Sequence, residues 1–161
     1  MGMHRQHYQP GAPARCWWKR GAQANGIGRS RGGLSTKVHL LVDALGLPVD
    51  FEVTEGQVHD VTLAPGLIER NEADAFLADK AYDSNQFRAR IAAKGASAVI
   101  PNKRNRTQPA AFDSDLYQAR SEIELTFNRL KQWRRFATRY EKTKRNYSSL
   151  VAIACAMVWL A

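Results

Sequence analysis

The sequence has little cysteine and no long apolar run, and each shortage excludes a class of protein. Cys16 and Cys155 are the two cysteines among 161 residues, and their separation gives neither a disulfide framework nor a zinc-binding spacing. The strongly apolar stretch at 150–161 is shorter than the ~20 residues that a membrane-spanning helix needs. No apolar run follows the charged N-terminal residues, so we expect no signal peptide, no membrane partner and a reducing, cytoplasmic location.

Acidic residues are also scarce relative to basic ones. Lys and Arg number 24 against 15 Asp and Glu, which gives a formal net charge of +9. This excess favours a polyanionic partner, most often nucleic acid, and a solvated basic surface is the alternative. Hydrophobic residues make up 44% of the chain, which is enough for the core of one domain and excludes disorder over most of its length.

The pattern along the chain changes near residue 27. Residues 1–26 carry Gly, Pro and basic side chains without strand or helix periodicity, and they predict a poorly ordered basic leader. Residues 27–161 are typical of a mixed α/β domain. We expect strands at 36–43, 49–54, 75–79 and 97–100, and helices at 60–70, 85–94, 113–134 and from 146 onward. The first two strands are joined by turn residues and predict a β-hairpin.

The expected long helix at 113–134 carries two adjacent faces at ~100° per residue. The apolar face is expected to pack on the core and consists of Leu116, Ala119, Ile123, Phe127 and Leu130. The face beside it is polar and consists of Tyr117, Arg120, Glu124 and Lys131. Such a polar face is typical of the wall of a cleft or, as the alternative, of an exposed salt-bridge ladder.

Asp79 ends an apolar run at a position where α/β folds place their ligands, although it is also consistent with an ordinary strand-end Asp. Asp79 and Glu124, if they line one cleft, can hold Mg²⁺, with Mn²⁺ as a substitute, and leave room for a phosphate. Clefts of this type normally use at least three acidic ligands. The sequence supplies two.

The polar face resembles the signature of a known family. Tyr117, Arg120, Glu124 and Lys131 match, with their spacing, the tyrosine–arginine–glutamate–lysine signature of the DDE transposases of bacterial insertion sequences. Flanking stretches are similar to the insertion-sequence-five group of these enzymes, namely GRSRGGLSTKVHLLVDALG (28–46), EGQVHD (55–60), LADKAYDS (77–84) and RRFATRYEK (134–142). The resemblance covers about residue 21 to the end of the sequence.

The resemblance implies a ribonuclease-H-like fold and a reaction on DNA. In this family, a phosphodiester is cleaved by water with Mg²⁺, and the freed 3′-hydroxyl then attacks target DNA. The resemblance makes Asp79 and Glu124 the second and third acids of the catalytic triad and the metal ligands. It implies that three neighbours contact the transposon end, namely Tyr117, Arg120 and Lys131.

Basic clusters at 28–33, 103–106 and 142–145 are further candidates for phosphate contact, which is sensitive to salt and blind to base sequence. In the second cluster the candidate DNA-binding residues are Lys103, Arg104 and Arg106. Flexible, solvated loops are the alternative for each cluster.

The chain departs from the family in residues 1–20, which contain no Asp or Glu. The family's first catalytic aspartate lies on a central strand upstream of GRSRGG, and HRQHYQ (4–9) lacks the apolar alternation of such a strand. Asp43 and Asp60 match non-catalytic places in the pattern. We therefore expect a partial ribonuclease-H-like domain at 27–161 that lacks the first, central strand and is inactive alone.

The expected partners follow from the same resemblance. They are DNA at insertion-sequence ends and at the target, the product of an upstream reading frame, and further copies of the chain in the active complex. We expect the protein to be associated with the nucleoid when it binds DNA. The alternative from another class is a basic relic protein that binds DNA without catalysis.

Overall fold

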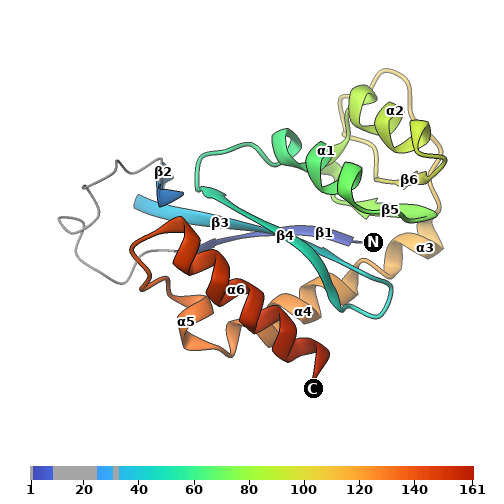
Figure 1. The fold of residues 1–161 in the computed structure, drawn as a ribbon. Helices are drawn as coiled ribbons and strands as arrows, with labels where there is room; N and C mark the ends of the chain where they lie inside the picture. Colours follow the sequence, from blue (N-terminus) through green and yellow to red (C-terminus); the bar gives the residue numbers. More distant parts are fainter. Residues whose placement is uncertain (1, 9–24, 31–32) are drawn as a thin grey trace.

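The computed structural model describes residues 2–8, 25–30 and 33–161. A mixed sheet lies between two groups of helices (Figure 1). Its strands are β1 (Gly2–Tyr8), β2 (Gly28–Ser30), β3 (Gly33–Val42), β4 (Pro48–Glu55), β5 (Ala75–Ala78) and β6 (Ser97–Val99). The helices are α1 (Asp60–Arg70), the 3₁₀ helix η4 (Lys80–Tyr82), α2 (Asn85–Ala93), α3 (Ser114–Gln118), α4 (Ser121–Lys131), α5 (Arg134–Ala137) and α6 (Lys144–Trp159).

Strand β1 lies in the middle of the sheet. It pairs antiparallel with β3 from Gly2 opposite Val42 to Tyr8 opposite Thr36. On its other side it pairs parallel with the end of β5, where Met3 lies opposite Ala78. β4 pairs with β3, and β6 runs parallel to β5. The mixed α/β architecture is that expected of a ribonuclease-H-like domain.

The expectation that the central strand is missing is wrong, because Gly2–Tyr8 occupies that place. The interpretation of HRQHYQ relied on the alternation of its side chains. Pairing on both edges instead satisfies backbone N–H and C=O groups, which any residue other than proline can offer. β1 lies within the predicted leader at 1–26. Residues 9–24 of that segment lie outside the described residues.

Two apolar clusters join the helices to the two faces of the sheet. Alternate residues of β3 point to opposite faces, so Val38 and Leu40 pack against α4 and α6, whereas Leu41 packs on the side of α1 and α2. The central members of both clusters are almost fully excluded from solvent. Figure 1 shows α4, α5 and α6 on one side of the strands and α1 and α2 on the other.

Local signals in the sequence predicted most of these elements. The hairpin is confirmed as β3 and β4, and the Asp43 carboxylate closes its turn by accepting the N–H groups of Leu45 and Leu47. Gly46 has a φ of 77° in this turn, a conformation that glycine adopts without strain. Ser84 caps α2 by accepting the Phe87 N–H. Among the described residues, no helix is both long and apolar enough to cross a membrane.

The helix expected over 113–134 is divided into α3 and α4, and α5 begins at its last residue. At the first junction the N–H groups of Ala119 and Arg120 bond to carbonyls three residues back, which is the tighter 3₁₀ pattern. The Ser121 hydroxyl also donates to the Gln118 carbonyl, a side-chain bond that competes with regular helix. A tight turn therefore precedes α4, and it places Arg120 at the entry to that helix.

Arg139 is a cation inside the core rather than on the basic surface. It is 0% exposed, and its guanidinium donates to the carbonyls of Asn25, Gly26 and Glu141. Its centre lies 5.0 Å from the ring centroid of Tyr147. Burial lowers the pKa of Arg139 to about 10, so it remains charged at neutral pH. This side chain ties the segment before β2 to the C-terminal part of the chain.

The position of β1 generates a prediction about folding. Deleting residues 1–8 would leave β3 and β5 as unpaired edges in the middle of the sheet, and exposed edges promote aggregation. Since a domain is stable by only ~5–15 kcal/mol, we expect the truncated chain to lose its cooperative thermal transition. Circular dichroism melting of the full and truncated chains measures this. Two equally sharp transitions would contradict the central placement of β1.

Candidate active site

Asp79 lies directly after the buried strand β5. The three residues before it are buried, and the strand ends where the backbone of Asp79 turns into η4. The Tyr82 N–H donates to the Asp79 carbonyl at 2.9 Å, and Tyr82 itself is buried. The backbone on both sides of Asp79 is therefore fixed by packing, while its side chain is one-third exposed.

Glu124, the other acid of the candidate site, lies on helix α4. The apolar side of this helix is buried against the sheet through Ile123, Phe127 and Leu130. The Thr126 hydroxyl bonds to the carbonyl of Gly46 in the β3–β4 turn, and a Cβ at Gly46 would lie 3.0 Å from this hydroxyl oxygen. This close contact fixes the register of α4 on the hairpin. Glu124 remains on the side of α4 that is open to solvent.

Arg120 bridges the two carboxylates. Its Nη1 lies 2.9 Å from Asp79 Oδ1, and its Nη2 donates to Glu124 Oε1 at 2.7 Å. Nη1 is buried and makes no hydrogen bond of good geometry within the described part of the chain, so its contact with Asp79 is an ion pair of short distance. One guanidinium thus holds two acids that are 45 residues apart in the sequence close to each other.

Tyr117 completes this group. The Arg120 guanidinium carbon lies 5.7 Å from the centroid of the Tyr117 ring, and Phe112 packs against the ring edge-to-face at 5.9 Å. Burial raises the pKa of the Tyr117 phenol, Arg120 opposes this shift and Asp79 adds to it. The phenol is therefore protonated at neutral pH and can donate a hydrogen bond.

The structure brings four of the predicted site residues together and leaves Lys131 apart from them. Asp79, Tyr117 and Glu124 all meet at Arg120. Lys131 is the last residue of α4, two turns beyond Glu124, and it is exposed. It lies on the same helix as Glu124 but makes no contact with the group within the described residues. Its role in DNA contact stays a prediction.

No third acid joins the pair within residues 2–8, 25–30 and 33–161. No group of three or more His, Cys, Asp or Glu side chains that could hold a metal ion occurs there. Asp43 is engaged in the hairpin turn, and Asp60 lies 3.1 Å from the Lys37 ammonium in a buried pair. β1, where the family resemblance would locate the first acid, contains no Asp or Glu.

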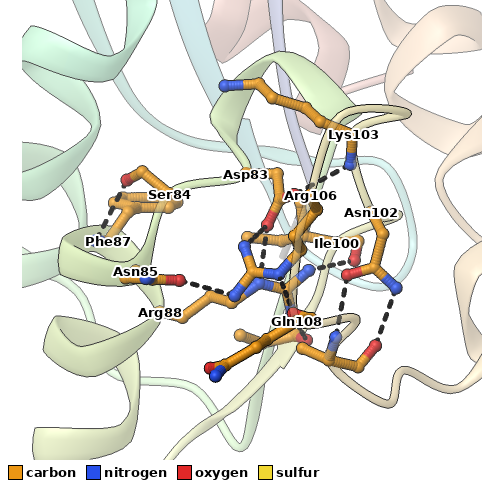
Figure 2. A network of polar contacts seen from close by, with 12 residues as sticks. Asp83, Ser84, Asn85, Phe87, Arg88, Ile100, Asn102, Lys103, Arg106 and Gln108 are labelled. Atoms are coloured by element: carbon orange, nitrogen blue, oxygen red, sulfur yellow. Dashed lines mark hydrogen bonds and ion pairs between the residues drawn. The ribbon is translucent and has the colours of Figure 1, made fainter.

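The basic loop at 101–109 is attached to a buried acid that sequence reasoning missed (Figure 2). Asp83 Oδ1 accepts hydrogen bonds from Arg106 at 2.6 Å and from Arg88 at 2.8 Å, and its Oδ2 accepts the Lys103 N–H. Burial alone would raise the pKa of Asp83, but these donors and charges outweigh it and lower the pKa below its ordinary value.

The candidate residues of this loop differ in their surroundings. Arg106 is directed toward Asp83, whereas Arg104 is exposed and Lys103 is half-buried. Asp83 meets this loop because the LADKAYDS block and the arginine-containing loop follow neighbouring parallel strands. Because β5 and β6 are parallel, their carboxyl ends meet at one edge of the sheet. DNA contact by these residues stays a prediction.

Known proteins are similar to this chain over most of its length. A family model described as "Transposase DDE domain" matches residues 4–159. A Brucella ovis protein named "Putative transposase for insertion sequence element IS6501" is 40% identical over 129 residues, which are 79% of this chain and 99% of that protein. A Burkholderia cepacia protein named "Putative transposase for insertion sequence element IS402" is 26% identical over 157 residues, 90% of this chain and 71% of that protein. The narrower resemblance to the insertion-sequence-five group stays a prediction.

The charges around Tyr117 predict opposite effects of two substitutions. Asp79→Asn removes a negative charge that disfavours the phenolate, so the pKa of Tyr117 should fall. Arg120→Met removes a positive charge that favours the phenolate, so this pKa should rise. NMR titration of ¹³Cζ-labelled tyrosine measures both shifts. Glu69→Gln, an exposed change on the other helical layer, is the control. A Tyr117 pKa that is unaffected by both variants would contradict the four-residue group.

Proposed function

The chain belongs to the family of DDE transposases, and from this premise we propose that it carries out Mg²⁺-dependent phosphoryl transfer on DNA. The proposed reaction is cleavage of phosphodiesters at insertion-sequence ends by water, followed by strand transfer into target DNA. The observation that carries the proposal is the shared contact of Asp79 and Glu124 with Arg120. It supports the proposal because the family resemblance implies that these two residues are the second and third acids of one catalytic triad.

The donor set fits a magnesium ion. Mg²⁺ prefers oxygen ligands, keeps several waters, and is commonly held by one or two carboxylates together with substrate phosphate oxygens. Asp79 and Glu124 would supply those carboxylates, and both are accessible to solvent. When bound, the ion would polarise the phosphoryl group and lower the pKa of a coordinated water.

The remaining side chains of the group act on the DNA. Arg120 is the charged donor beside the acids, and guanidinium groups bind phosphate oxygens in a bidentate manner. Tyr117, which is protonated at neutral pH, donates a hydrogen bond to a second phosphate oxygen. Arg120 would exchange its two carboxylates for the phosphate when substrate and metal enter. The same side chain therefore neutralises the acids in the free protein and positions DNA in the complex.

A third carboxylate is still needed. We include in the proposal that the chain is inactive alone and that the acid comes from a second polypeptide, such as the product of an upstream reading frame. The active complex would also contain further copies of this chain. The absence of a third acid within the described residues favours one other candidate, a basic relic that binds DNA without catalysis.

Metal binding tests the site itself. Calorimetry should detect the binding of Mn²⁺ to the wild-type protein. Asp79→Asn and Glu124→Gln should each abolish this binding. Arg120→Ala should bind Mn²⁺ about tenfold more tightly, because a competing positive charge at contact distance is removed. Glu72→Gln, which removes an exposed acid from another part of the surface, is the matched control. Equal affinity in the wild type and in all four variants would contradict the proposed metal site.

An assay of DNA cleavage distinguishes the proposed transposase from a relic that binds DNA without catalysis. The chain joined to an upstream segment that carries an acid should nick DNA containing the element's ends when Mg²⁺ is added, whereas the chain alone should not. Asp79→Asn in the joined protein should abolish nicking while DNA binding persists. A joined protein that binds DNA but never nicks it would support the relic, and nicking by the 161-residue chain alone would disprove its inactivity.

A further inference from the structure

Asp83 is a buried acid outside the candidate active site, and its carboxylate accepts three hydrogen bonds. Its side chain is 1% exposed, and it lies between two guanidinium groups that are themselves mostly buried. Arg88, one of the two, also donates to the Ile100 carbonyl at 2.5 Å. Asp83 therefore connects α2, the end of β6 and the loop at 101–109.

The turn that contains Asp83 begins at Asp79. η4 consists of Lys80–Tyr82, and its two flanking residues are Asp79 and Asp83. The Asp83 N–H donates to the Lys80 carbonyl at 3.2 Å. Tyr82 is buried and packs on Phe87 of α2, with 6.0 Å between their ring centroids. A displacement of Asp83 would therefore be transmitted over one short turn to the backbone of Asp79.

The loop at 101–109 is held in one shape by its own contacts. The Asn102 side chain donates to the Ala110 carbonyl at 2.8 Å and accepts the Ala110 N–H at 3.0 Å, which closes the base of the loop. Arg106 uses Nη1 on Asp83, Nη2 on Asn85 at 2.6 Å, and Nε on the Gln108 carbonyl at 2.6 Å. All three guanidinium nitrogens of Arg106 thus donate to acceptors in the loop itself or in the residues beneath it.

Lys103 and Arg104 have no such engagement. Neither side chain takes part in an ion pair with the described residues, and Arg104 is exposed. Figure 2 shows the Lys103 side chain extending away from Arg106 and Arg88 while its backbone N–H is held by Asp83. The loop therefore presents two cations at the same edge of the sheet as Asp79, on a base that is fixed before any ligand binds.

We propose that 101–109 is a preformed docking loop for the DNA backbone, in which Lys103 and Arg104 contact phosphates and Asp83 and Arg106 are positioning residues. Asp83 holds this loop and the Asp79 turn in one fixed relation, so that DNA bound by the loop is aligned with the acids. The inference rests on the proposed function. It also revises the sequence-based expectation for Arg106, because that side chain shapes the loop instead of contacting DNA.

Two variants with opposite changes in charge test the positioning role. Asp83→Asn raises the net charge by one, and Arg106→Gln lowers it by one. If Arg106 contacted phosphate directly, Asp83→Asn would free it and tighten DNA binding. If both residues position the loop, both variants should weaken binding of a fluorescent DNA duplex, by roughly three- to tenfold. Both should also speed amide hydrogen exchange over 101–110 and at 82–83.

Variants at Lys103 and Arg104 complete the test. The double variant Lys103→Gln, Arg104→Gln should reduce the magnitude of the negative slope of log K against log salt by about 1.8, at ~0.9 per phosphate contact. Its hydrogen exchange should be unchanged. Arg90→Gln removes one exposed charge that pairs with Glu69 of α1 and should leave the loop's exchange and the slope near their wild-type values. It separates a local effect from a change in net charge.

The outcomes distinguish this inference from the proposed function. Tighter DNA binding by Asp83→Asn, or unchanged exchange over 101–110 in both positioning variants, would overturn the positioning role. An unchanged salt slope in the double variant would overturn the docking role of Lys103 and Arg104. If the wild-type protein bound no DNA at any salt concentration, the proposed function itself would fail, and the exchange rates would still decide whether Asp83 fixes the loop.

Discussion

The contact of one guanidinium with two carboxylates is the constraint on which the candidate site depends. Asp79 and Glu124 come from the end of a strand and from a helix on one side of the sheet, and two carboxylates at close range repel each other. Arg120, placed between them at hydrogen-bond distance, offsets this repulsion in the free protein. Positive charge is thus already bound at the place where we propose that Mg²⁺ binds.

The rest of the fold holds the two acids in position. β5 fixes Asp79 from inside the sheet, and α4 is fixed by its buried apolar side and by the Thr126 contact with the hairpin turn. The 3₁₀ turn before α4 supplies Arg120. Asp83 then secures the backbone immediately after Asp79. Each of these supports comes from a different segment, so the site forms only when the sheet and both helical layers are assembled.

The sequence predicted features that depend on local chemistry. Alternation gave the β3–β4 hairpin, and the apolar run before Asp79 gave β5. The shared polar face of Tyr117, Arg120 and Glu124 also follows from spacing and residue type. These features could be predicted because they arise from periodicity and from neighbours only a few residues apart.

Features that depend on distant partners were not predicted. β1 has no clear pattern of its own and forms because β3 and β5 offer it backbone partners on both sides. Arg106 lies in a loop whose composition indicates exposure, yet a buried acid 23 residues earlier draws it inward. Arg139, within a basic run, is buried because carbonyls more than 100 residues earlier accept its hydrogen bonds. In each case the deciding neighbour is set by tertiary structure.

The most direct measurement is the anomalous scattering of manganese in crystals of the full chain soaked with Mn²⁺. We predict a peak between Asp79 and Glu124, at a metal–oxygen distance of about 2.1 Å from each, with Arg120 withdrawn from at least one carboxylate. A structure at saturating Mn²⁺ in which both carboxylates remain on Arg120 and no peak lies between them would contradict the assignment of these residues as a metal-binding pair.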